Sequence, residues 1–262
     1  MTFHPQQPIE ILLPRLKAWF DSELGKELLT AEKAVVDRIV SSLFGVHLAQ
    51  FSVDSRVKLY EESPVTHCFS VIPRLELGVD EHNLVADNKE IPLAHESVDV
   101  VVLHHALDFT DSPHQVLREA SRILRPGGHV VIVGFNPLSA WGLYRLFSRK
   151  KDLPPWCAHF ISHRRLSDWL KLLQMTELRH ITGYHGQAFE KLTMRSRLTC
   201  LRNSIKRSPA KNGAFTVMLA RKDIAGMTPL RSGWTLRRLI NIPVAEPSTR
   251  GSLKPVNTKE SA

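Results

Sequence analysis

The chain has 262 residues, 43% hydrophobic and 23% charged, which indicates a globular domain and excludes a fibrous or wholly disordered chain. No run of about eighteen apolar residues predicts a membrane-spanning helix. Residues 1–20 lack the basic segment and unbroken apolar stretch of a secretory signal. The cysteines Cys68, Cys157 and Cys200 are too few for a disulfide framework and too scattered for a zinc site. We therefore expect a cytoplasmic protein without a bound metal ion.

The net charge of +9 is unevenly divided between the two halves of the chain. Residues 1–136 carry a net charge of −7, and residues 137–262 carry +16. Such asymmetry indicates an anionic partner, which includes nucleic acid, anionic lipid and phosphorylated metabolites. The other interpretation, a solvated basic surface with a basic tail, stays equally open. Residues 191–213 hold seven basic residues, no acid and no interleaved aromatic, which argues against sequence-specific RNA recognition.

Hydrophobic periodicity predicts alternating strands and helices along most of the chain. Apolar residues three and four positions apart predict a first long helix that Gly45 closes. Four consecutive apolar residues, Val100 to Leu103, are typical of a parallel strand buried on both faces. The predicted strands are 46–52, 66–72, 82–86, 97–107, 129–135, 178–185 and 215–222. The predicted helices are 27–44, 112–124, 138–151 and 162–174, and residues 125–128 form a tight turn.

This alternation predicts an α/β domain with a mostly parallel sheet and right-handed crossovers. We expect three parts of the chain. Residues 1–26 form an N-terminal helical extension and residues 27–222 form the main domain. Residues 223–262 are rich in Pro, Ser and Thr and lack periodicity, which predicts a basic, disordered tail.

The segment "ADNKEIPLAHESVDVVVLHHALDFTDSPHQVLREASRILRPGGHVVIVGF", residues 86–135, resembles the central block of class I SAM-dependent methyltransferases, specifically the type-eleven methyltransferase family. The acid Asp87, "IPL", "SVDVV", "HHALDF" and "RILRPGG" follow in the family's order and spacing. The segments "FGVHLAQ" and "GFNPLSAWGLYRL" resemble a small bacterial subgroup. The resemblance covers roughly residues 27–222. It implies a Rossmann-like three-layer sandwich, a seven-stranded sheet with helices on both faces, and S-adenosylmethionine (SAM) as cofactor.

Candidate site residues follow from the carboxyl ends of the strands, where open parallel sheets bind ligands. The resemblance implies that Asp87, with neighbouring Asn88, contacts the adenine of SAM; a turn-capping role is the alternative. His104 and His105 end the fourth strand, one expected to face the crevice and the other to pack inside. Either is a candidate general base, and His104 is also an expected cofactor contact. The alternative for each is a packing histidine.

The family's glycine-rich loop after the first strand is missing. Gln50 stands roughly where the family has an acid, and Ser52, Val53 and Asp54 replace the glycines. The second strand ends in Ile72–Arg74, without the acid that binds ribose in the family. Gln50, Ser52 and Asp54 are therefore cofactor contacts only through an altered loop. Three interpretations stay open: SAM in a changed site, another nucleotide-like ligand, or an inactive protein that keeps the fold.

Residues 137–156 combine aromatic and basic side chains after the fifth strand, where the family forms its substrate lid. We expect Asn136, Trp141 and Arg145 to contact the substrate; simple packing of an amphipathic helix is the alternative. A small-molecule, lipid-like or RNA acceptor fits this segment. The sequence thus predicts SAM-dependent methyl transfer to an unidentified acceptor. The alternative is a catalytically inactive fold that binds nucleic acid or another anion through its basic half.

Overall fold

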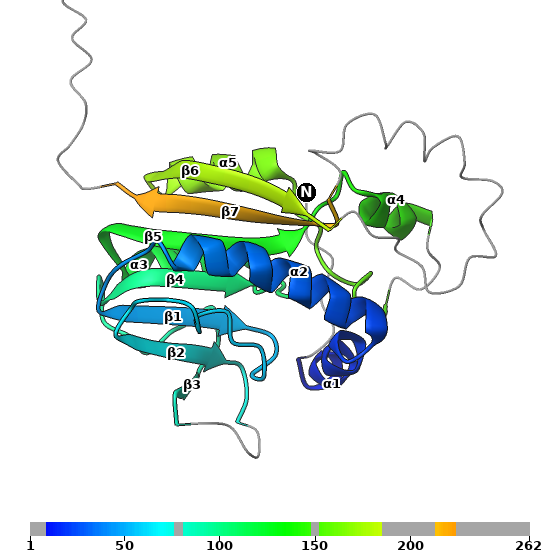
Figure 1. Ribbon diagram of the computed structural model, residues 1–262, viewed down its shortest axis with the longest axis horizontal. Coiled ribbons are helices and arrows are strands. Elements are labelled where there is room, and N and C mark those ends of the chain that lie inside the picture. The colour runs from blue at the N-terminus through cyan, green and yellow to red at the C-terminus, as the bar shows by residue number, and fades with distance from the viewer. Residues whose placement is uncertain (1–8, 76–80, 148–151, 185–212, 224–262) are drawn as a thin grey trace, which may run out of the picture. The chain divides into compact units, whose positions relative to one another are not determined.

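The computed structural model describes residues 9–75, 81–147, 152–184 and 213–223 (Figure 1). Seven strands form one sheet in the order β3-β2-β1-β4-β5-β7-β6. The strands are β1 (His47–Ser52), β2 (His67–Ile72), β3 (Asn83–Val85), β4 (Val98–His104), β5 (Leu124–Phe135), β6 (Met175–Gly183) and β7 (Phe215–Lys222). The helices are α1 (Ile9–Phe20), α2 (Glu23–Val40), α3 (Pro113–Ile123), α4 (Ala140–Phe147) and α5 (His163–Leu172).

The predicted fold class is confirmed: strands β1 to β5 run parallel, and β7 pairs antiparallel with both β5 and β6. Each predicted strand overlaps one strand of the structure. The predicted tail lies outside the described residues from 224 onward, as does the basic segment from 191 to 212. No helix in the described part of the chain is long and apolar enough to cross a membrane.

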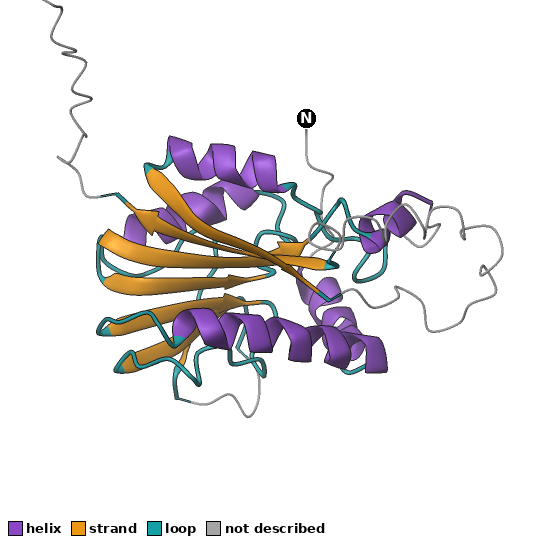
Figure 2. Cartoon of the chain, turned by 45° about the horizontal axis from the view of Figure 1, so that its top comes forward, coloured by secondary structure: helices purple, strands orange, loops and turns teal. Residues whose placement is uncertain are grey.

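The sheet is covered by helices on both faces, as Figure 2 shows. Successive side chains of a strand point to opposite faces, so β1, β4 and β5 each feed two hydrophobic clusters. One cluster joins the strands to α1 and α2 and includes Leu16, Leu28, Val36, Leu48, Val100 and Val131. The other joins them to α3 and α5 and includes Phe51, Val101, Leu103, Val116, Val130 and Trp169. This double burial explains why the central strands are continuous apolar runs.

Helix α2 starts and ends earlier than the periodicity predicts. The Ser22 hydroxyl caps its first turn by accepting a hydrogen bond from the Gly25 N–H at 3.2 Å. The helix ends at Val40, so the prediction that Gly45 closes it is wrong. Gly45 instead lies against Asp99, where a Cβ would sit 2.4 Å from the Asp99 Cβ. The close approach of the segment before β1 to Asp99 on β4 therefore explains this glycine.

Strand β5 includes the segment that the sequence predicts as a tight turn. It begins at Leu124, and its register with β4 shifts between the Val98 and Val100 pairings. Gly127 adopts a φ of 81°, in the left-handed region that glycine enters without strain. Residues 125–128 are therefore an irregular start of the strand.

The connection between β1 and β2 contains no helix, although residues 53–66 are all described. Parallel strands are usually joined through a crossover helix. Here Gln50 fixes the loop instead: its amide nitrogen donates to the Val57 carbonyl at 2.5 Å, and its amide oxygen accepts from the Leu59 N–H at 2.8 Å. Val53, Val57 and Leu59 are buried in the same cluster as α1 and α2. The loop thus fills part of the layer that a helix would occupy.

Candidate functional site

The carboxyl ends of β1, β4 and β5 bring distant polar residues together. Ser52 and His104 are register partners on neighbouring strands. The His105 N–H donates to the Val133 carbonyl of β5 at 3.0 Å. His105 has a φ of 51°, an uncommon value for a residue with a side chain. This turn brings the His105 ring beside the His104 ring, with ring centroids 4.8 Å apart.

A buried carboxylate from α2 joins both histidines. Glu32 is 0% exposed, and its two oxygens lie 3.1 Å from Nε2 of His104 and 3.0 Å from Nε2 of His105. The sequence pattern does not identify Glu32, which lies among the buried, mostly apolar positions of α2. A lone carboxylate at an apolar helical position is the signal that identifies it, since buried charges require partners.

The opposite nitrogens of the two rings also face polar groups. His105 Nδ1 lies 2.8 Å from an Asp108 oxygen, which also accepts a hydrogen bond from the Phe135 N–H at 3.0 Å. His104 Nδ1 lies 3.5 Å from the Ser52 hydroxyl. Both rings are fully buried, so the expectation that one faces an open crevice is wrong. We call Glu32, His104, His105 and Asp108 the buried cluster.

Burial and charge shift the four pKa values in different directions. Burial alone would raise the pKa of Glu32, but the charge of His105 and hydrogen bonds from both imidazoles lower it below the ordinary value. Burial opposes protonation of His105, yet Glu32 and Asp108 raise its pKa. Burial lowers the pKa of His104 and raises that of Asp108. Without a bound cation, the strongest ion pair therefore joins Glu32 to His105.

The predicted contacts at the end of β1 are occupied by interactions within the chain. The buried Asp54 carboxylate accepts three hydrogen bonds from Arg56, two of them at 3.0 Å and one at 2.8 Å. The Gln50 amide holds the loop, as described above. Helix α1 lies beyond the strand ends (Figure 1), and its Phe20 ring is 5.9 Å from the His104 ring. The β1 end therefore does not fit SAM in the way that the resemblance implies.

Asp87 and Asn88 follow β3, the outermost strand on one side of the sheet, and lie at the same carboxyl-terminal edge as the ends of β1 and β4. The Asp87 side chain is 60% exposed, and one of its oxygens accepts a hydrogen bond from the Lys89 N–H at 2.9 Å. The Asn88 Oδ1 has no hydrogen-bond partner among the described residues. Strands β2 and β1 separate this position from His104 on β4. Of the predicted cofactor contacts, only these two follow a strand without being buried.

The three predicted substrate contacts are tied into the structure. Asn136 is 5% exposed, and its side-chain amide donates to the Gly213 carbonyl at 2.9 Å. Trp141 is 1% exposed and packs among aromatic rings, with its indole N–H unpaired within the described residues. The Arg145 guanidinium donates to the Trp156 carbonyl at 2.8 Å. Their role in substrate binding stays a prediction.

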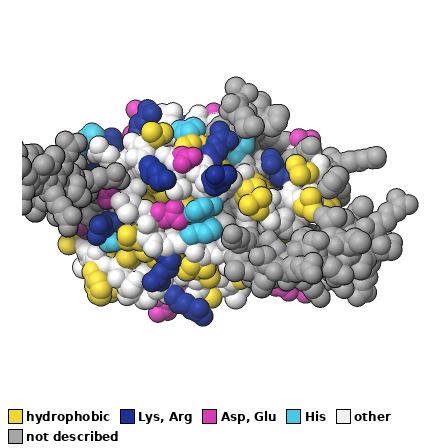
Figure 3. Space-filling model, turned by 90° about the horizontal axis from the view of Figure 1, so that it is seen from above, with side chains coloured by type: hydrophobic (Ala, Val, Ile, Leu, Met, Phe, Trp, Pro, Cys, Tyr) yellow, Lys and Arg dark blue, Asp and Glu magenta, His cyan; other side chains and the backbone are white. Residues whose placement is uncertain are grey.

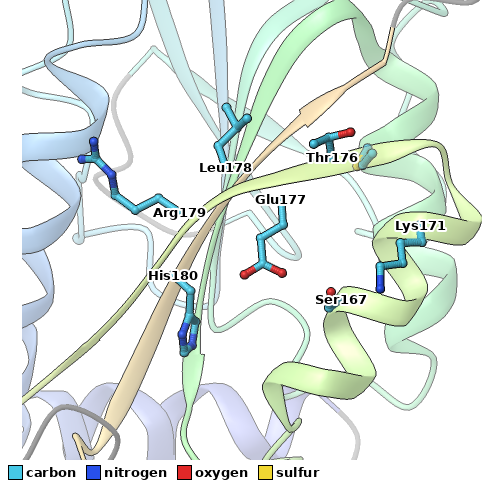
Figure 4. Close-up of a pocket in the computed structure, with 8 residues that line it drawn as sticks. Ser167, Lys171, Thr176, Glu177, Leu178, Arg179 and His180 are labelled. Atoms are coloured by element: carbon cyan, nitrogen blue, oxygen red, sulfur yellow. The ribbon is translucent and has the colours of Figure 1, made fainter. Parts of the chain in front are cut away.

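A second polar site lies in a groove between α5 and β6 (Figure 4). Its lining includes Ser167, Lys171, Thr176, Glu177, Arg179 and His180. Glu177 lies 2.7 Å from His163 Nε2, and the rings of His163 and His180 are 4.1 Å apart. We call His163, Glu177 and His180 the surface cluster. Figure 3 views the molecule from this side, and acidic, basic and histidine side chains are interspersed there.

Comparison with known proteins agrees with this fold. A family profile described as a methyltransferase domain matches residues 31–132. The uncharacterized Escherichia coli protein YafS is 32% identical over 167 residues, which covers 64% of this chain and 68% of YafS. The ubiquinone/menaquinone biosynthesis C-methyltransferase UbiE of Syntrophotalea carbinolica is 37% identical over 70 residues, or 25% of this chain and 29% of UbiE.

Solved structures show the same architecture. A SAM-dependent methyltransferase of Thermotoga maritima superposes with a TM-score of 0.53 at 17% identity, over 82% of this chain and 98% of that one. The parallel sheet and the ordered motifs from Asp87 to Gly128 define the class. The chain belongs to the class I SAM-dependent methyltransferase family.

Proposed function

We propose that this protein transfers a methyl group from SAM to an acceptor that its sequence does not name. The observation that carries the proposal is the family match over residues 31–132, which runs from α2 to β5. That range contains the carboxyl ends of β1 to β4, where ligands bind in open parallel sheets. A small-molecule, lipid-like or RNA acceptor in the cytoplasm is compatible with this proposal.

The support is unevenly distributed along the sheet edge. Asp87 offers an exposed carboxylate of the kind that binds a nucleoside, and Asn88 beside it is half-buried, with a buried Oδ1 that has no partner among the described residues. Gln50, Ser52 and Asp54 are buried and bonded within the chain. We therefore assign cofactor contact to the end of β3. We assign no catalytic role to His104 and His105, because both rings are fully buried.

Titration of the full chain with SAM and with S-adenosylhomocysteine tests the proposal. We expect saturable one-to-one binding by calorimetry, and thermal stabilisation worth about 2.7 kcal/mol at 100 times the dissociation constant. Asp87→Ala should weaken binding. Asp168→Ala, which removes an exposed carboxylate from α5, is the matched control and should leave it unchanged. Lack of binding at millimolar SAM would contradict the proposal and leave the anion-binding alternative.

A further inference from the structure

The two histidines and Glu32 converge on one point inside the protein. One ring nitrogen of His104, one of His105 and a Glu32 carboxylate oxygen all lie within 4.8 Å of one another. Nε2 of each histidine lies within hydrogen-bonding distance of Glu32. All three residues are 0% exposed. We propose that Glu32, His104 and His105 bind one divalent transition-metal ion of the Zn²⁺ or Fe²⁺ class. This inference does not rest on the proposed methyl transfer.

The donor set and its spacing suit such an ion. Zinc bonds to imidazole nitrogen and carboxylate oxygen at about 2.0–2.2 Å, so neighbouring ligand atoms of a tetrahedral site lie roughly 3.4 Å apart. Nε2 of His104 lies 3.1 Å from Oε2 of Glu32 and Nε2 of His105 lies 3.0 Å from Oε1, so each imidazole faces its own carboxylate oxygen at slightly less than that spacing. Two histidines and one carboxylate select borderline metals such as zinc and iron rather than calcium or magnesium. Three protein ligands leave a further coordination position for water or a small ligand.

The groups behind the ligands support the same assignment. A metal-binding histidine usually donates its other ring N–H to a carboxylate, a carbonyl or water. His105 Nδ1 faces Asp108 at 2.8 Å, and the Phe135 N–H holds the same Asp108 oxygen in place. His104 Nδ1 faces the Ser52 hydroxyl, which donates its own hydrogen to the Asp54 carbonyl. Both rings thus direct Nε2, the nitrogen left for a metal, toward Glu32.

Formal charge in the closed site balances with a divalent cation. With Nδ1 of each ring as donor, two Nε2 lone pairs and the Glu32 carboxylate face one another. Because acceptors facing acceptors repel in a low-dielectric interior, this arrangement needs a positive charge between them. A proton on His105 supplies that charge when the site is empty, and a divalent ion replaces the proton when it binds. One divalent ion neutralises the carboxylates of Glu32 and Asp108 together.

The first test measures metal content and affinity in the full chain, purified without an affinity tag. We expect elemental analysis to find one zinc or iron ion per chain. After removal with a chelator, Co²⁺ should bind at one equivalent with the visible absorption of a low-coordinate nitrogen–oxygen site. Failure of the stripped protein to bind stoichiometric Zn²⁺ or Co²⁺ would overturn the proposal.

Matched variants locate the site. Glu32→Gln should abolish stoichiometric binding, whereas Glu177→Gln, in the surface cluster, should leave it intact. Metal binding by Glu32→Gln equal to that of the parent protein would overturn the assignment. If Glu32→Gln does not fold, Asp108→Asn decides, since it leaves all three ligands in place. It should weaken Zn²⁺ affinity about 10- to 100-fold, and an unchanged affinity would contradict the proposed role of Asp108.

Discussion

The buried cluster and the surface cluster use the same chemical groups in opposite environments. In the buried cluster, Glu32 and His105 are 0% exposed and contact each other at 3.0 Å. In the surface cluster, His163 and Glu177 lie closer, at 2.7 Å, but their side chains are 40% and 25% exposed. Water screens the second pair and replaces either partner when the other is lost. Distance alone therefore does not rank the two pairs; burial does.

The largest effect is expected from Glu32→Leu. Removing this carboxylate leaves the two buried imidazoles without their shared partner, and His105 keeps only Asp108. Breaking a buried ionic pair from one side typically costs about 3–5 kcal/mol. Urea denaturation should show a loss of that size in the free energy of unfolding. A loss below about 1 kcal/mol would show that the buried cluster is as weakly coupled as a surface pair.

Asp108→Asn should have an intermediate effect. The amide oxygen still accepts a hydrogen bond from the Phe135 N–H, but the charge facing His105 is lost. We expect about 1–3 kcal/mol of destabilisation, the range for one buried hydrogen bond whose partner is left without full compensation. Comparison with Glu32→Leu in the same denaturation experiment should preserve this order. The reverse order would show that Asp108, and not Glu32, organises the cluster.

Glu177→Gln should change stability only slightly. The exposed pair with His163 is expected to contribute about 0.2–1 kcal/mol. Thermal denaturation at low and high salt is the measurement, because screening weakens exposed pairs. A loss comparable to that of Asp108→Asn would contradict the ranking by burial.

The smallest effect concerns pH. Burial and the neighbouring His163 lower the pKa of His180 below its ordinary value of 6.5. The unfolded chain then binds more protons than the folded one, so acidification through this window reduces stability. His180→Gln should lose less stability than the parent protein between pH 7 and pH 5. Equal pH dependence of the two proteins would show that His180 does not contribute.

Much of this fold is predictable because the apolar pattern is local. The continuous run from Val100 to Leu103 indicates a doubly covered strand without knowledge of its neighbours. The end of α2 is less predictable. Gly45 looks like a helix-closing glycine in the sequence, but it is there because it packs against Asp99 on β4, which lies far away along the chain. Domain limits at residues 26 and 222 stay predictions, although α2 itself begins at Glu23.

The candidate site is predictable only in part. The position of His104 and His105 at the end of β4 follows from sequence order. Their common partner, Glu32, cannot be predicted in this way. It lies 72 residues before His104 and reaches it only because α2 packs on the sheet. The role of Gln50 is hidden for the same reason: its amide saturates backbone groups in a loop whose course depends on α1 and α2.

The two outer strands of the open sheet, β3 and β6, affect how readily one molecule pairs with another. Unpaired edge strands template the addition of strands from other molecules and so promote aggregation. Strand β3 has only three residues. Strand β6 presents Glu177 and Arg179, and its register with β7 shifts between these two residues. Short length, charge and irregular register each hinder edge-to-edge pairing. The folded chain therefore carries, at both edges of its sheet, protection against polymerisation into extended β-structure.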